Sequence, residues 1–99
     1  MRMMMRAHIP VESGNKAIQD GTIKKTIEET MNQLQPEAAY FLAENGKRTA
    51  YFFFDMQDSS QIPPAGEPLF LNMNAEIDLI PVMTADELGK GLEDLAKGR

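Results

Sequence analysis

Hydrophobic and polar residues alternate at the start of the chain. Between residues 2 and 9, one parity is apolar: Met3, Met5, Ala7 and Ile9. The other parity carries Met4, Arg6 and His8. A period of two is typical of a β-strand with one buried face. Pro10 predicts the end of this strand, because proline has no N–H to donate to a sheet ladder.

The period then lengthens to that of a helix, over residues 16–34. Its apolar positions follow a spacing of three and four: Ile18, Ile23, Ile27, Met31 and Leu34. Asn15 is a candidate N-cap for this helix. Gly21 weakens the first turns, so the regular helix is expected from about Thr22. Pro36 predicts its end.

A β-hairpin is predicted next. Residues 38–43 and 48–54 are rich in strand-forming residues, and Asn45-Gly46 between them suits the positive-φ positions of a two-residue turn. This turn sets the register of the two strands. The opposed pairs on one face are Glu44/Lys47, Leu42/Thr49, Tyr40/Tyr51 and Ala38/Phe53. Those on the other face are Ala43/Arg48, Phe41/Ala50 and Ala39/Phe52.

The segment after the hairpin contains several helix breakers, at Pro63, Pro64, Gly66 and Pro68. They argue against a long regular helix and leave a short one, capped by Ser59 or Ser60. Alternation returns over residues 75–83, where Pro81 predicts an edge strand or a bulge.

The chain closes with a second strong helix signal. Thr84 and Glu87 match a capping box. An amphipathic stripe follows, formed by Leu88, Leu92 and Leu95, and Gly98 suits the C-terminal end of this helix.

The predicted elements follow the order β-α-β-β-α-β-α. A chain of 99 residues is expected to form a single domain, residues 1–99. The βαββαβ order predicts a ferredoxin-like α+β fold with an added C-terminal helix. Its four-stranded antiparallel sheet has the order 4-1-3-2, and its helices lie on one face.

The other face of this sheet is left without a cover. By parity it carries Met4, Arg6, His8, Tyr40, Leu42, Thr49, Tyr51, Phe53, Glu76, Asp78 and Ile80. This set is too apolar for a monomer to leave in water. We therefore expect a homodimer in which two sheet faces enclose a partly polar cavity.

The element order, the Glu44-Asn45-Gly46-Lys47 hairpin and this face pattern together resemble the dimeric α+β barrel superfamily of ferredoxin-like homodimers. The resemblance covers the whole chain and includes no catalytic motif. Superfamily members include cofactor-free oxygenases, lactone isomerases and haem enzymes, so the resemblance implies a dimer and selects no activity. Residues 36–41 look like part of a group of small bacterial proteins without an assigned activity.

Composition narrows the function classes. Lys and Arg number 10 against 15 Asp and Glu, and the resulting net charge of −5 argues against nucleic acid or an anionic membrane as partner. The absence of cysteine excludes disulfides and thiolate chemistry. Arg6 and His8 interrupt the apolar N-terminal run, so no targeting or membrane segment is expected and the protein is predicted to be cytoplasmic.

The candidate chemistry lies on the open face. Register places Arg6 and His8 beside Glu76 or Asp78, with Tyr51 on the other side. A carboxylate can fix the tautomer of a histidine, so His8 is the candidate general base and Asp78 its partner. Arg6 would bind an anion, and the tyrosines would donate to a carbonyl oxygen. The ligand-binding set is Arg6, Tyr40, Tyr51, Phe53 and Glu76.

Simpler interpretations compete with this one. Arg6 and His8 would also pair with Glu76 and Asp78 merely to satisfy charges inside a non-catalytic dimer interface. A metal site of His8, Glu76 and Asp78, or haem bound through His8, has suitable ligand types but no spacing motif. We expect no metal and no cofactor, and we assign the methionines to core packing.

RNA binding is the least favoured class. Residues 47–54 partly match the RNP1 strand of RNA-recognition modules. Arg48 and Thr49, however, stand where that motif has a glycine and a stacking aromatic residue. The acidic net charge also opposes binding.

Overall fold

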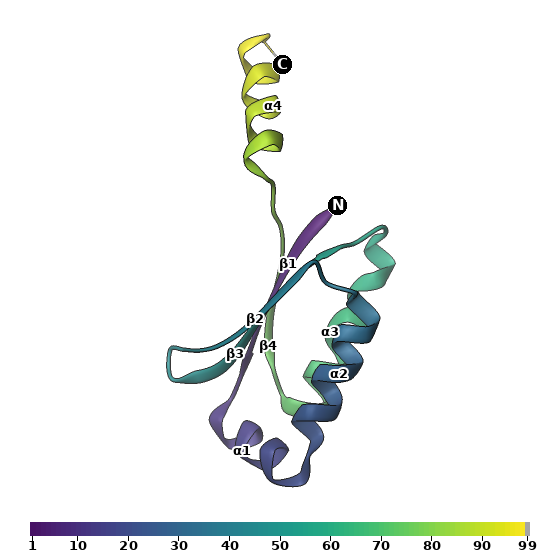
Figure 1. Ribbon diagram of the computed structural model, residues 1–99, viewed down its shortest axis with the longest axis vertical. Helices are drawn as coiled ribbons and strands as arrows, with labels where there is room; N and C mark the ends of the chain where they lie inside the picture. The colour runs from purple at the N-terminus through teal and green to yellow at the C-terminus, as the bar shows by residue number, and fades with distance from the viewer. Residues whose placement is uncertain (99) are drawn as a thin grey trace.

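A four-stranded antiparallel sheet organises the molecule, and its strand order is β2-β3-β1-β4. The computed structural model describes residues 1–98 (Figure 1). Its elements are β1 (Arg2–Ile9), α1 (Val11–Asp20), α2 (Thr22–Leu34), β2 (Ala38–Glu44), β3 (Lys47–Asp55), the 3-10 turn η1 (Ser59–Gln61), α3 (Ile62–Met73), β4 (Glu76–Pro81) and α4 (Ala85–Ala96). The predicted ferredoxin-like α+β fold and the predicted strand order are confirmed.

The hairpin of β2 and β3 has the predicted register, pair for pair. Asn45 and Gly46 occupy its turn with φ of 54° and 76°, which is the left-handed backbone that this dipeptide tolerates. Strand β1 lies between β3 and β4, so that Arg6 is opposite Tyr51 on one side and Asp78 on the other. Alternation along β1 therefore decides which side chains reach each face.

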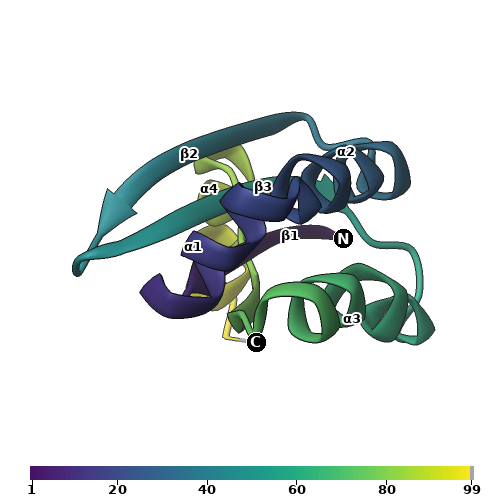
Figure 2. The ribbon, with the colours of Figure 1, turned by 90° about the horizontal axis from the view of Figure 1, so that it is seen from below.

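The core lies between the sheet and the helices α1, α2 and α3, which all pack on one side of it (Figures 1 and 2). The inward parity of β1 is buried as predicted, at Met3, Met5, Ala7 and Ile9. Phe52 of β3 and Leu69 and Met73 of α3 are also fully buried. The opposite sheet face has no helix over it in the described chain (Figure 1).

The first helical region differs from the prediction. It forms two helices, α1 and α2, joined at Gly21, whose φ of 80° lies in the left-handed region. Asn15 is not a cap, because α1 already begins at Val11; its Oδ1 accepts a hydrogen bond from Arg48 at 3.1 Å instead. Pro10 is the residue at the N-cap, and proline suits a helix start because no intrahelical partner exists for its missing N–H.

Helix α2 confirms the predicted stripe only in part. Leu34 is buried, and Ile23, Ile27 and Met31 pack half-buried against the core, but Thr26 and Thr30 occupy the fully buried positions. The threonines can face α3 because their hydroxyl groups are satisfied: Thr30 donates to the Thr26 carbonyl, and Thr26 Oγ1 accepts from Asn72. This turns the isoleucines toward the outer strand β2.

Helix α3, with 12 residues, is longer than the short helix that its prolines and glycine predict. Pro63 and Pro64 lie in the first turn, where N–H groups have no helical acceptor, and Pro68 lies inside the helix. The preceding turn is capped by Asp58 rather than by Ser59 or Ser60, since the Asp58 side chain accepts from the Ser60 backbone N–H. Burial of Leu69 and Met73 explains why the helix persists across Pro68.

Strand β4 and helix α4 follow the predictions closely. The strand lies at the edge of the sheet and ends at Pro81. Thr84 and Glu87 form the predicted capping box of α4. This helix extends away from the rest of the molecule, which gives the molecule a long dimension of 56 Å against 28 and 18 Å (Figure 1). None of the described helices is long and apolar enough to cross a bilayer.

Candidate functional site

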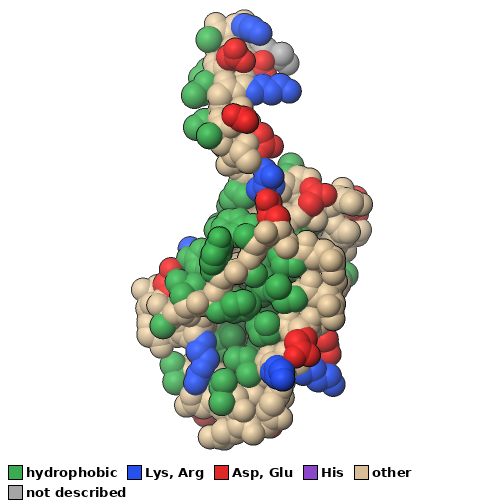
Figure 3. All heavy atoms as spheres, viewed as in Figure 1, with side chains coloured by type: hydrophobic (Ala, Val, Ile, Leu, Met, Phe, Trp, Pro, Cys, Tyr) green, Lys and Arg blue, Asp and Glu red, His purple; other side chains and the backbone are tan. Residues whose placement is uncertain are grey.

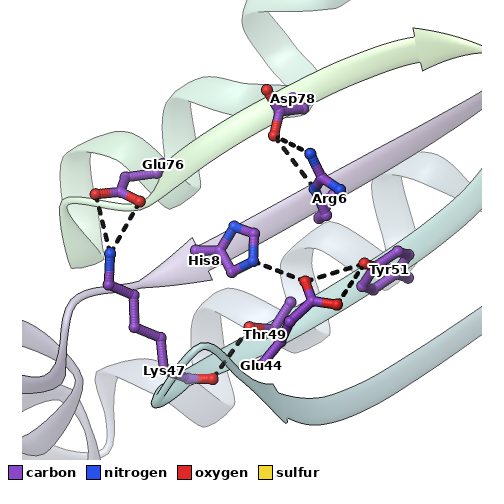
Figure 4. Close-up of polar contacts among 8 residues, drawn as sticks. All are labelled: Arg6, His8, Glu44, Lys47, Thr49, Tyr51, Glu76 and Asp78. Carbon is purple, nitrogen blue, oxygen red and sulfur yellow. Dashed lines mark hydrogen bonds and ion pairs between the residues drawn. The ribbon is translucent and has the colours of Figure 1, made fainter.

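His8 is the centre of a polar row on the open face of the sheet. It lies on central strand β1, and its parity opposite Ala7 and Ile9 directs the imidazole away from the core. Its side chain is only 13% exposed. The ring Nε2 lies 2.8 Å from Glu44 Oε1 (Figure 4). His8 is therefore held in one orientation, with its second ring nitrogen turned away from Glu44.

Glu44 connects two strands of this row. It is the last residue of β2, and from there its carboxylate reaches the face over β3. The Tyr51 hydroxyl donates to both carboxylate oxygens, at 3.0 and 2.9 Å. The hydrogen bond with His8, and then that with Tyr51, lower the pKa of Glu44 despite its partial burial. The carboxylate consequently stays ionised and can stabilise positive charge on His8.

The carboxylate partner of His8 is thus Glu44, not Asp78 or Glu76 as expected. The predicted neighbourhood is correct, since Glu76 lies opposite His8 and Asp78 opposite Arg6. However, the Glu76 carboxylate accepts from Lys47 Nζ at 3.1 and 3.3 Å. The hairpin register also places Glu44 and Lys47 on the open face. This signal in the sequence was sufficient to add both residues to the candidate site.

Arg6 and Asp78 form the next ion pair along the face (Figure 4). Asp78 Oδ2 accepts from Arg6 Nη2 at 2.8 Å and from Nε at 3.2 Å. The hydrogen bond to Asp78, followed by the interaction with Tyr51, raises the pKa of Arg6. Arg6 thus keeps its charge beside the His8–Glu44–Tyr51 row, but part of its guanidinium is already engaged.

Tyr40 and Phe53 belong to the other end of the open face. Their rings meet edge to face with centroids 6.5 Å apart. They line a shallow pocket of about 300 Å³ together with Arg2, Glu37 and Ala38. The structure therefore separates the predicted ligand-binding set into two groups, and only Arg6, Tyr51 and Glu76 lie near His8.

The composition of the row decides which chemistry it can support. Among residues 1–98, no three His, Cys, Asp or Glu side chains gather closely enough to hold a metal ion. The row instead contains a histidine, an ionised carboxylate and a fixed cation, which suit proton transfer and anion binding. Thr49 lies opposite His8 and is buried, and its hydroxyl donates to the Lys47 carbonyl.

Comparison of the chain with protein-family models and with curated proteins found no match. The assignment of function therefore depends on the fold and on the geometry around His8.

Proposed function

We propose that the protein is a homodimer of the dimeric α+β barrel type that binds a small molecule between the open faces of its two sheets. The carrying observation is the His8–Glu44–Tyr51 row, which is ordered and mostly shielded although no helix covers it. On a surface exposed only to water, a histidine side chain is expected to be exposed and hydrogen-bonded to solvent rather than to two side chains of the protein. The ligand is a small carboxylate or enolisable carbonyl compound, because these complement an arginine and a histidine.

Exposed apolar residues around the row support pairing of the two faces. Tyr40, Leu42 and Ile80 are large, lie on the open face and remain exposed. Together with Phe53 and Met4, Tyr40 and Ile80 form an apolar patch at one end of the charged row, and Leu42 lies on β2 near its other end. Covering these residues with a second copy removes them from water and encloses the polar row in a cavity. A low-dielectric cavity would strengthen the interactions of Arg6 and His8 with a ligand.

The geometry supports a specific role for each group in the row. When Nε2 of His8 donates to Glu44, the lone pair of Nδ1 can accept a proton from the ligand. Ionised Glu44 then stabilises the imidazolium that forms. Arg6 is placed to neutralise a developing enolate or a carboxylate. Tyr51 is a positioning residue, since its hydroxyl is committed to Glu44.

A non-catalytic dimer interface is the second candidate, and one observation favours it. The charges of the row are already paired within the chain: Lys47 with Glu76, Arg6 with Asp78 and His8 with Glu44. In that case the ion pairs serve only to satisfy charges that dimerisation removes from water.

The two candidates differ in what happens at the His8 ring. We expect a saturable change in the ¹⁵N and ¹³C NMR signals of His8 when a panel of small keto, hydroxy and dicarboxylic acids is titrated. His8→Gln should abolish the thermal stabilisation by any acid that binds, while Lys90→Gln, far along α4, should retain it. If the protein is a dimer and no member of the panel shifts the His8 ring, the interface interpretation is preferred.

A further inference from the structure

Helix α4 carries an apolar stripe that its own chain does not cover. Leu88, Leu92 and Leu95 lie on one side of the helix, and their exposed fractions are 48%, 55% and 65%. In the described chain α4 contains no buried residue. Leucines aligned on one side of a helix normally pack against another element, because burial removes them from water. The stripe therefore indicates a surface that meets a partner.

The start of α4 is fixed at the end of the sheet. The Val82 N–H donates to the Arg2 carbonyl at 3.1 Å. The Glu87 carboxylate accepts from Arg2 Nη1 at 3.1 Å, and Arg2 Nε donates to Glu37 at 2.6 Å. Arg2 begins β1, which is an inner strand. Although α4 follows the edge strand β4, its first turn is therefore attached to the end of an inner strand.

Helix α4 projects on the open side of the sheet. Figures 1 and 2 both show α2 and α3 on the right of the molecule and α4 to the left of the N-terminus, away from these helices. In Figure 3, which has the view of Figure 1, hydrophobic side chains line the left edge of α4, whereas charged side chains lie at its front and right. The apolar stripe thus faces away from α2 and α3, as the open face of the sheet does.

The stripe continues an apolar surface that begins on the sheet. The apolar patch of the open face lies at the end from which α4 leaves, because Met4 and Ile80 are paired just before β4 ends at Pro81. A stable interface buries about 800 Å² per partner, which is more than three leucine side chains supply. A partner that covers the stripe must therefore also cover neighbouring surface, and the patch is apolar surface at the same end and on the same side.

The charge pattern of α4 favours a protein over a lipid surface. With 3.6 residues per turn, the small residues Ala85, Gly91 and Ala96 flank the leucine stripe. The charged residues of the helix lie on its other side: Asp86, Glu87, Lys90, Glu93 and Asp94. Most of them are acidic, which opposes binding to an anionic membrane. The stripe itself carries no charge, so a second acidic chain can meet it without direct repulsion.

We propose that the second copy that packs on the open face also covers the leucine stripe of α4, and that the contact is reciprocal. The inference rests on the proposed dimer but not on any chemistry at His8. One symmetric interface then covers two apolar surfaces, the patch on the sheet and the stripe on the helix. It also accounts for the stability of α4, since helices of about 12 residues are marginal in water and Gly89 and Gly91 lower helix propensity further.

Photo-cross-linking from α4 tests the proposal, because the natural chain contains no cysteine. Leu92→Cys protein that carries benzophenone maleimide is mixed with isotope-labelled unmodified protein, allowed to exchange subunits and irradiated. We expect a covalent product of twice the chain mass that joins one labelled and one unlabelled chain. Lys90→Cys, on the opposite side of α4, should give at least tenfold less product. A cross-link within one chain, or none in protein that is dimeric, would overturn the proposal.

A second measurement uses matched changes of charge. Leu92→Glu and Lys90→Gln lower the net charge equally, on opposite sides of α4. We expect Leu92→Glu to raise the dimer dissociation constant at least tenfold in analytical ultracentrifugation and Lys90→Gln to leave it within about twofold. Equal dissociation constants for the two variants would contradict the proposal.

Tyr51→Glu, on the open face, separates this inference from the proposed function. It should dissociate the dimer and abolish the cross-link from Leu92→Cys, because the same copy covers both surfaces. A cross-link that persists unchanged in Tyr51→Glu protein would show that α4 meets a different copy, and the inference would be wrong. If the cross-link forms as expected but no acid shifts the His8 ring, the contact of α4 is supported and only the ligand proposal fails.

Discussion

Helices α3 and α4 have the same length, 12 residues, but differ in how their local sequence signals relate to their burial in the fold. Local signals are poor in α3, which contains three prolines and a glycine, and better in α4, where a capping box and a regular leucine stripe stand against two interior glycines, Gly89 and Gly91. Yet α3 buries Leu69 and Met73 completely, whereas α4 buries nothing in its own chain. Local propensity and tertiary burial are therefore independent contributions, and α4 has only the first of them within one chain.

The largest expected effect comes from deleting one leucine in each helix. Leu69→Ala in α3 should lower the free energy of unfolding by about 2–5 kcal/mol at every protein concentration, because Leu69 is fully buried. For dilute monomers, Leu92→Ala in α4 should change it by less than about 0.5 kcal/mol, because Leu92 is 55% exposed in its own chain. Urea denaturation at two concentrations measures both. Equal, concentration-independent losses would show that α4 packs on its own chain.

The helix caps should differ in a similar way. Thr84→Ala removes the side-chain acceptor for the Glu87 N–H, and we expect a loss of about 1 kcal/mol in the stability of α4. The effect should be confined to α4, whose amide protons should exchange faster while those of α3 do not change. Lys90→Ala, at an exposed position of α4 outside the cap, is the control. Faster exchange throughout the molecule would mean that α4 supports the core.

Glycine replacement should strengthen α4 selectively. Gly89 has helical backbone, and a Cβ added there meets no atom within 4 Å in the described chain. Gly89→Ala should therefore stabilise α4 by roughly 0.5–1 kcal/mol. The corresponding change in α3, Gly66→Ala, should be neutral or unfavourable, since its Cβ would lie 3.3 Å from the Phe70 ring. Circular dichroism and thermal unfolding of both variants test this contrast.

Acidification should affect α4 more than α3, although a hydrogen-bonded carboxylate lies in the first turn of α4 and another caps the turn η1 that precedes α3. The hydrogen bonds from Thr84 lower the pKa of Glu87, and those from Ser60 lower the pKa of Asp58. A lowered pKa contributes stability above the unfolded value, near 4 for both residue types, that is lost as pH falls through the folded value. Protection factors should fall first in α4, where Glu87 also binds Arg2, while buried Leu69 and Met73 maintain α3. Glu87→Gln should remove this pH dependence of α4.

The hairpin and the His8 site show how far local information extends. The Asn45-Gly46 turn determines the β2–β3 register through short-range backbone geometry, so every pair could be predicted. The acidic neighbours of His8 on β4 followed instead from the predicted strand order together with strand parity. The hydrogen-bond partner of His8 could not be predicted, because Glu76 and Glu44 both lie within reach of the same face. Competition with Lys47 decided the outcome, and such competition depends on side-chain positions in three dimensions.

Periodicity alone determined which residues of each strand face the core, where the hairpin turns, and that α4 has one apolar side. These are properties of the backbone and of nearest neighbours along the chain. Tertiary structure alone decided that α2 buries threonines, that α3 tolerates Pro68, and that the leucines of α4 face water. Each of these outcomes depends on which surfaces meet, and burial free energy belongs to a pair of surfaces rather than to either sequence segment.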